Sequence, residues 1–441
     1  MELKVGKEKR VKLLFSEVNV YSHRRASLNM RASKDPLMRE SKRYKLSQKD
    51  AGFLLRAVQE RASANKKPEI KWGNQAAHLP YDLIFKILLL LPAESLHRSS
   101  FVCKAWFNLI NSPDFIEAHM GQSETVLIFL QSVPERRPKT FSIEAKLSPS
   151  KHDSIFLTNE APKPYINFLE VEDGMGKVSE SNISGCKDIL ATCNGLILAK
   201  CELNRGLLVM NPATRKLVGL PLGTIVPRDE SYGFVFSHLT REYKVVHLFR
   251  DESGYIGCEI LSLNRKSWWA VDGPSLGLLR RFIYKPVSAI GALHWLPAKH
   301  DCNYLVSMGI DDEKFQTKTL PVSSSISDRL VEVGGFLSFV THVTRNRIEA
   351  WILKGLEGED WVKQHIITTD DRIVDLIPLS TLRHGREMVF KGYRDSFYAY
   401  DFEAQAMRKV EMEKRPVQHN GSYLPHVNCL ASWESLGGAL W

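Results

Sequence analysis

The sequence has 441 residues, enough for two or three domains, and its 44% hydrophobic and 25% charged residues are typical of a folded globular protein. The formal net charge of +10 is uneven, because residues 1–78 carry a net charge of +11 and the remainder carries −1. A neutral main body argues against a nucleic-acid-binding main domain. The longest apolar run, Ile87–Leu91, is far shorter than a membrane span, so no membrane association is expected.

The cysteines indicate a reducing compartment. Seven are present without any Cys-x-x-Cys pair, and Cys186, Cys193 and Cys201 are spaced too widely for a common zinc site. The N-terminus is also too charged for a secretory signal. We therefore expect reduced thiols, no metal, and a location in the nucleus, the cytoplasm or both.

Residues 1–75 form a basic leader that is expected to lack a stable core. One segment, Ser47–Val58, has a capping-box-like start and an apolar face that predict a helix. Its basic clusters allow two interpretations, a nucleic-acid-binding or nuclear-import segment and a solvated tail. The solvated tail is the interpretation that we favour.

Residues 76–120 predict three short helices. Pro80 suits the first helical position and Pro92 ends the first run. The second helix is expected at Ala93–Arg98, and residues 111–113 end the third. The apolar residues assigned to the first and third helices are Leu83, Ile84, Ile87, Leu88, Leu91, Phe101, Val102, Trp106, Leu109 and Ile110.

So small a module cannot bury this much apolar surface alone, so some of it must face the rest of the chain or a partner. The ordered elements L-P-x-D-L-I, I-L-x-x-L-P, S-L-x-R and V-C-K-x-W resemble the F-box, the adaptor-binding module of SCF ubiquitin ligases. Lys86 and Leu90 depart from its commonest form, and charge tunes the choice among related adaptors. The resemblance assigns the adaptor contact and its supporting core to Leu79, Pro80, Leu83, Ile84, Ile87, Leu88, Leu91, Leu96, Val102, Trp106 and Leu109.

Downstream, the pattern changes to short strands. Residues 121–185 are interpreted as a linker with the first strands, beginning at Thr125–Leu130, and several prolines indicate loops and edge strands. In residues 186–436, the Asn194-Gly195 pair between apolar runs predicts a hairpin. Polar turns beginning at Asn211, Asn264, Asp311, Glu357 and Asp401 are 53, 47, 46 and 44 residues apart.

That spacing is typical of the blades of a β-propeller. The strand near Val126 and the stretch Val427–Trp433 are expected to share one blade; the alternative architecture is a large β-sandwich. The segments CNGLILA, NPATRKLVGLP, YGFVF, EYKVVHLF, EILSLNRKSWW, GALHWL, GIDDEKFQTKTLP and GGFLSFV occur in order between Cys193 and Val340. They resemble the F-box-associated domain of plant F-box proteins, which is related to kelch propellers. The fold class expected is therefore a three-helix F-box followed by an all-β, propeller-like domain.

Catalytic patterns are lacking: the sequence contains no Gly-x-Ser-x-Gly, HExxH, P-loop or GxGxxG motif. His294 is interpreted as a structural histidine, and Asp311–Glu313 as a hairpin turn. Cys103 is expected to be a small buried residue. Trp268 and Trp269 should point to opposite faces of a strand, one toward the core and one toward solvent as a weak candidate for substrate binding.

The resemblance implies a non-catalytic substrate-recognition subunit of an SCF-type ubiquitin ligase, without a cofactor. It would bind a Skp-family adaptor and, through it, the cullin and RING subunits, while the β domain binds an unknown protein substrate. Two alternatives are an F-box scaffold or inhibitor acting outside a ligase and, less favoured, a nucleic-acid-binding protein that uses the basic leader.

Overall fold

The computed structural model describes residues 81–132, 164–182, 186–201, 206–225, 230–275, 284–297, 301–355, 360–370, 373, 375–413 and 422–434. The chain divides into two units, Met1–His78 and Leu79–Trp441, and all described residues belong to the second. The predictions for the basic leader, its helix, Leu79 and Pro80 lie outside the described residues. Within the described part, no helix has the length and apolar character needed to cross a membrane.

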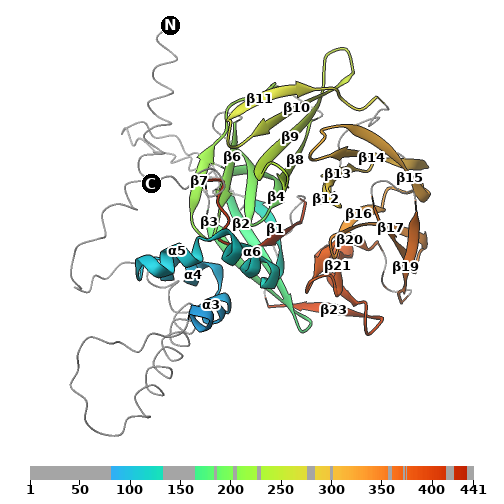
Figure 1. Cartoon of the computed structure of the whole chain (residues 1–441). Coiled ribbons are helices and arrows are strands. Elements are labelled where there is room, and N and C mark those ends of the chain that lie inside the picture. The colour runs from blue at the N-terminus through green and yellow to red at the C-terminus, as the bar shows by residue number, and fades with distance from the viewer. Residues whose placement is uncertain are drawn as a thin grey trace, which may run out of the picture. The chain divides into compact units, whose positions relative to one another are not determined.

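Four short helices open the described part of the chain (Figure 1), namely α3 (Tyr81–Leu89), α4 (Ala93–Ser99), α5 (Lys104–Ile110) and α6 (Pro113–Gln122). The first two follow the prediction, and Pro92 separates them as the N-cap of α4. The third helix begins later than predicted. Phe101 and Val102 lie in the turn before α5 and are exposed, so their assignment to that helix is wrong.

The fourth helix is an addition to the three that the sequence indicated. Pro113, which was expected to stop the third helix, begins α6 instead, because a proline at the first helical position lacks only an N–H that would be unpaired anyway. Ser112 caps this helix, and its Oγ accepts a hydrogen bond from the backbone N–H of Phe115 at 3.3 Å. Helix α6 then leads into the first strand.

The helices share one apolar core, and the β domain contributes to it. Ala213 and Leu430, which are both buried, pack in this cluster and therefore cover part of the apolar surface of the helices. The helical side chains buried there are Leu88, Ala93, Leu96, Leu109, Ile110 and Phe115.

The described strands form four sheets of four strands and one sheet of eight, and the latter divides at a short parallel pairing into two antiparallel units of four. Figure 1 shows these units following one another through the β domain. This arrangement confirms the predicted propeller-like fold, and the β-sandwich alternative is wrong. Blade 1 contains β24 (Leu424–Val427), β1 (Thr125–Ser132), β2 (Pro164–Glu172) and β3 (Met175–Asn182). Blade 2 contains β4 (Cys186–Cys193), β5 (Leu196–Cys201), β6 (Leu207–Asn211) and β7 (Lys216–Gly219).

The other four blades use consecutive strands. Blade 3 contains β8 (Glu230–Ser237), β9 (Glu242–Arg250), β10 (Ile256–Ser262) and β11 (Ser267–Val271). Blade 4 contains β12 (Val287–Ala289), β13 (Ala292–Trp295), β14 (Cys302–Gly309) and β15 (Phe315–Ser324). Blade 5 contains β16 (Arg329–Val333), β17 (Phe336–Thr344), β18 (Arg347–Leu353) and β19 (Trp361–Thr368). Blade 6 contains β20 (Ile377–Leu382), β21 (Glu387–Lys391), β22 (Phe397–Asp401) and β23 (Ala406–Met412), with the short 3-10 helix η2 (Tyr393–Asp395) between β21 and β22.

The two ends of the β domain meet in blade 1, as the sequence indicated. Strand β24 pairs antiparallel with β1, and His426 lies opposite Val126. A short parallel pairing also joins the outer strands of blades 6 and 1, with Glu411 opposite Met175. The ring is therefore closed by strand pairing between distant parts of the chain.

Six apolar clusters fill the spaces between neighbouring blades, so each blade is buried on both faces. Strand β1 illustrates the consequence, because Leu127 packs toward blade 6 and Ile128 toward blade 2. Such strands need apolar residues on both faces. This explains why Thr125–Leu130 reads as a continuous apolar run rather than an alternating one.

The predicted turns fall at equivalent places. Those at Asn211, Asn264, Asp311 and Asp401 each connect the third and fourth strands of a blade; the turn at 357–360 lies mostly outside the described residues. The Asn194-Gly195 hairpin is confirmed, with φ of 47° and 72°. The turn between the third and fourth strands of blade 1, at Asp173-Gly174, was not predicted, although an Asp-Gly pair between apolar runs is a hairpin signal.

Candidate functional sites

Helix α3 is apolar on two faces, and only one of them is used by the fold. Leu88 is fully buried in the helical core, whereas Leu83 is 47% exposed and Leu90 is 78% exposed. Ile87 lies between these two on the outer side and is half-buried. Leu83 and Ile87 are four residues apart and share one stripe of the helix, and Leu90 lies in the turn directly after it.

More apolar side chains are exposed on α5 and in the turn before it. Val102 is 66% exposed, and Phe101 and Phe107 are exposed as well. The ring of Phe101 meets that of His97 edge-on, with 5.2 Å between the centroids. We call Leu83, Ile87, Leu90, Phe101, Val102 and Phe107 the outer apolar face.

The structure separates the residues that the sequence grouped together. Leu83 and Val102 are exposed, and Leu88, Leu96 and Leu109 form the buried core. Those that are half-buried are Ile84, Ile87, Leu91 and Trp106. Leu90, Phe101 and Phe107 were not assigned to a contact, because a sequence pattern does not distinguish an outward apolar face from an inward one.

Cys103 corrects another expectation. It is exposed rather than buried, because it occupies the N-cap position before α5, where the chain is extended and turns away from the core. His97 lies on α4, before this turn, in partly buried and positively charged surroundings. Burial and the nearby Lys216, Arg215 and Arg98 lower the pKa of His97.

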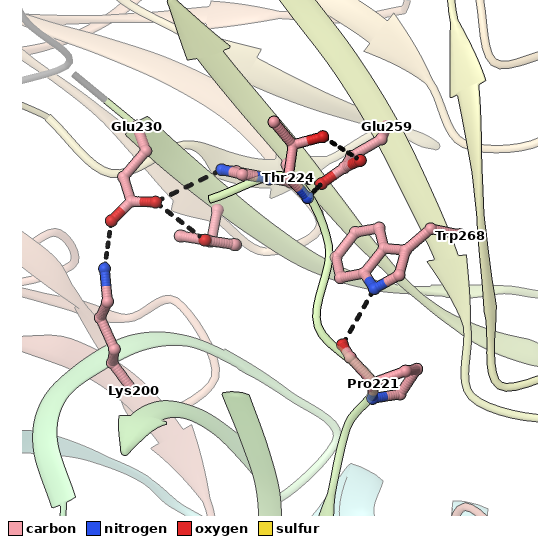
Figure 2. Close-up of polar contacts among 8 residues, drawn as sticks. Lys200, Pro221, Thr224, Glu230, Glu259 and Trp268 are labelled. Atoms are coloured by element: carbon pink, nitrogen blue, oxygen red, sulfur yellow. Dashed lines mark hydrogen bonds and ion pairs between the residues drawn. The ribbon is translucent and has the colours of Figure 1, made fainter. Parts of the chain in front are cut away.

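A second feature is a small pocket between blades 2 and 3, with a volume of about 30 Å³, which is room for little more than a water molecule. Lys200 enters it from β5, Glu230 from β8, His247 from β9 and Trp268 from β11. The segment Leu222–Ile225, which links the two blades, completes the lining (Figure 2).

A buried histidine joins two carboxylates beside this pocket. His247 Nδ1 lies 2.8 Å from Glu259 Oε1, and His247 Nε2 lies 3.4 Å from Glu230 Oε2. Glu230 also forms an ion pair with Lys200 and accepts a hydrogen bond from the hydroxyl of Tyr232 at 2.9 Å. The rings of Tyr232 and His247 are stacked, with centroids 4.3 Å apart.

These contacts shift the pKa values of the ionisable groups in the cluster. Burial disfavours the imidazolium, but the carboxylates of Glu230 and Glu259 outweigh it and raise the pKa of His247. Burial likewise opposes ionisation of Glu230, but hydrogen bonds from His247, Lys200 and Tyr232 lower its pKa to about 2. Burial also opposes ionisation of Glu259, but hydrogen bonds from His247 and Thr224 lower its pKa.

The same cluster holds the link between the blades in place. Thr224 donates two hydrogen bonds to Glu259, from its backbone N–H at 2.7 Å and from Oγ1 at 2.9 Å. Trp268 Nε1 donates to the carbonyl oxygen of Pro221 at 3.0 Å (Figure 2). The link is therefore anchored at Pro221 and at Thr224.

Both tryptophans are partly buried, so the expectation that one faces solvent is wrong. Trp268 packs against the cluster between blades 2 and 3, and Trp269 against the cluster between blades 3 and 4. Trp269 Nε1 also donates to Glu313 Oε2 at 3.0 Å. Strand alternation held, but in a propeller both faces of a strand meet a neighbouring blade.

The remaining candidates for chemistry have structural roles. His294 is fully buried, with Nδ1 2.7 Å from Ser307 Oγ and Nε2 3.1 Å from the carbonyl of Ala289, and burial lowers its pKa to about 4. Glu313, in the predicted turn, forms an ion pair with Lys244 at 2.8 Å. In the part of the chain that the structure describes, no group of His, Cys, Asp or Glu is arranged to hold a metal ion.

The described part of the chain thus consists of a short helical module with exposed apolar side chains, followed by a six-bladed β-propeller. The family model described as "F-box associated beta propeller domain" matches residues 148–429, and the one described as "F-box domain" matches residues 77–117. The chain therefore belongs to the F-box proteins that carry an F-box associated β-propeller domain.

Similar proteins come from Arabidopsis thaliana. "F-box protein CPR1" is 23% identical over 78% of this chain and 87% of its own length. "Putative F-box/kelch-repeat protein At3g17570" is 25% identical over 68% of this chain and 74% of its own. "Probable F-box protein At5g47300" is 26% identical over 82% and 88%, respectively. The similarity thus spans most of both chains and is consistent with a plant F-box protein.

Proposed function

We propose that this protein is the substrate-recognition subunit of an SCF-type ubiquitin ligase. The F-box would bind a Skp-family adaptor, and through it the cullin and RING subunits, and the propeller would bind a target protein. The observation that carries the proposal is the outer apolar face, which the propeller leaves exposed while it covers the other face of the helices.

The energetics favour a partner for this face. A fully buried aliphatic or aromatic side chain contributes about 1.5–3 kcal/mol relative to its exposed state. Leu83, Leu90, Phe101 and Val102 forgo most of this contribution in the isolated chain. Large apolar side chains that gather exposed on one small module of a folded protein are typical of an interaction site.

The proposed mechanism requires no chemistry from the chain itself. An F-box protein acts generally as a non-catalytic adaptor, and holding the target beside the ubiquitin-charged enzyme raises the effective concentration of the reacting groups. The propeller contributes a rigid platform, because each of its blades packs against both neighbours.

The test is a binding measurement between the full-length double variant Leu83→Asp/Val102→Asp and a purified Skp-family adaptor. Both side chains are exposed, so the fold should persist. Loss of two apolar contacts of about 1.5–3 kcal/mol each predicts affinity at least about 100-fold weaker. The control is Leu239→Asp, which charges an exposed leucine in the β8–β9 turn and should leave adaptor binding unchanged.

Adaptor affinity equal to that of the parent would refute the F-box assignment to this face. The alternative function, a scaffold or inhibitor outside a ligase, uses the same adaptor contact. The two functions are distinguished by whether a cullin is recovered together with the adaptor. Recovery of a cullin with the parent protein, and accumulation of a bound target after depletion, would favour the ligase. Recovery of the adaptor without a cullin would favour the scaffold.

A further inference from the structure

The segment that links blade 2 to blade 3 and lines the small pocket lies on the side of the propeller away from the F-box. The F-box enters blade 1 through α6 at the start of β1, which is the second strand of that blade after β24. Because strands in a blade alternate in direction, the turns between third and fourth strands lie on that same side. Ala213, in such a turn, accordingly packs in the helical core. Links from one blade to the next lie on the opposite side, and residues 220–225 are the described part of the link that follows blade 2.

This link presents two aliphatic side chains to solvent from an anchored backbone. Leu222 is 56% exposed and Ile225 is 58% exposed, although hydrogen bonds to Glu259 and from Trp268 hold the residues around them. Gly223 fits closely against Glu259 and Trp268, where a Cβ atom would clash. Exposed apolar residues on a backbone that is already ordered bind with little further loss of conformational entropy.

The charged groups beside the link differ in how many further hydrogen bonds they can form. Both oxygens of Glu230 and both of Glu259 already accept contacts from His247, Lys200, Tyr232 or Thr224. The ammonium of Lys200 can donate three hydrogen bonds, and its contact among the described residues is with Glu230. Its side chain is 23% exposed. An incoming group is therefore matched best by an acceptor, above all a carboxylate.

We propose that the segment Pro221–Ile225, together with Lys200, is a docking site for a linear peptide of the target protein that carries an aliphatic or aromatic residue next to an acidic one. The apolar residue packs on Leu222 and Ile225, and the carboxylate accepts a hydrogen bond from Lys200. The inference rests on the proposed function as a substrate receptor and names the class of target segment that the distal side of the propeller takes.

The experiment presents a displayed library of random linear peptides to the full-length protein and measures the affinity of the enriched peptides by fluorescence polarisation. Enriched sequences should pair an apolar residue with Asp or Glu. Affinity should fall about tenfold to a hundredfold in Leu222→Ser/Ile225→Ser, as the loss of buried aliphatic surface predicts. Lys200→Gln should weaken the acidic peptides and leave alanine-substituted versions of them unchanged.

The matched control is Leu239→Ser/Val362→Ser, which removes exposed aliphatic side chains from the β8–β9 turn and the outer strand of blade 5. This variant should bind the enriched peptides as the parent does. Enriched peptides that bind Leu222→Ser/Ile225→Ser with parental affinity, a preference for basic peptides, or no enrichment would each overturn the inference. Adaptor binding is measured on the same proteins. If the parent binds the adaptor but the peptide results fail, only the peptide site is refuted. If the parent does not bind the adaptor, the proposed function is refuted.

Discussion

Asn211 offers a direct test of how the closed ring is held together. This residue ends β6 and is 1% exposed, and its side chain forms four hydrogen bonds. Its Nδ2 donates to the carbonyl oxygens of Cys429 at 3.0 Å and Ala431 at 2.8 Å. Its Oδ1 accepts from the backbone N–H groups of Ala213 at 2.9 Å and Thr214 at 3.1 Å. One amide thus joins a turn of blade 2 to the segment that follows the closing strand.

We expect Asn211→Ala to lower the free energy of unfolding by about 3 kcal/mol. Each neutral hydrogen bond contributes about 0.5–1.5 kcal/mol net, and a buried backbone group that loses its partner has no water to replace it. Urea unfolding of the full-length protein, followed by tryptophan fluorescence, measures the change. Trp433 reports on this region because it is part of the segment that contains Cys429 and Ala431, and it packs against the cluster between blades 2 and 3.

Two further variants make this prediction specific. Asn264→Ala changes an exposed asparagine in the corresponding β10–β11 turn and should alter the stability by no more than about 0.5 kcal/mol. Asn211→Asp keeps the acceptor but places a carboxylate beside two carbonyl oxygens, so it should destabilise at least as strongly as alanine. A loss below about 1 kcal/mol for Asn211→Ala, or full tolerance of Asp, would refute the reasoning.

The remaining predictions concern His247 and Gly195. Because the folded state raises the pKa of His247, its contribution to stability is complete below the unfolded value of 6.5 and is lost as the pH rises through the folded pKa. The stability difference between the parent and His247→Gln, from urea unfolding at several pH values, should therefore shrink with rising pH; a difference that grows contradicts this. Gly195 has φ of 72°, and a Cβ there would lie 2.5 Å from Cys429 Sγ and 2.7 Å from the carbonyl oxygen of Val427. Gly195→Ala should cost at least about 1 kcal/mol more than Gly291→Ala, which has φ of 75° and open space; equal costs would refute the clash.

Local chemistry was readable from the chain. The Asn194-Gly195 hairpin follows from the backbone conformation that these residues tolerate, and the turns at Asn211, Asn264, Asp311 and Asp401 mark equivalent positions in successive blades. Pro92 separates two helices as expected. The propeller and the F-box could be predicted because their signals repeat at short range or occur as an ordered motif.

The predictions from the sequence were wrong where a residue is compatible with two local structures. Pro113 can end one helix or begin the next, and the cap formed by Ser112 decided for the second. Phe101 and Val102 have the composition of a buried face but lie in an exposed turn. Trp268 and Trp269 alternate as a strand requires, yet both are covered, because each face of the blade has a neighbour.

The sequence by itself determined the order of the domains, one turn in each of several blades and the apolar surplus of the F-box. Only the tertiary structure decided which apolar side chains remain exposed, because that depends on Ala213 and Leu430 covering the other face. It also brought together Lys200, Glu230, His247 and Glu259, which come from four strands of two blades. No local pattern predicts such a cluster, since its members share a location only after the blades have packed.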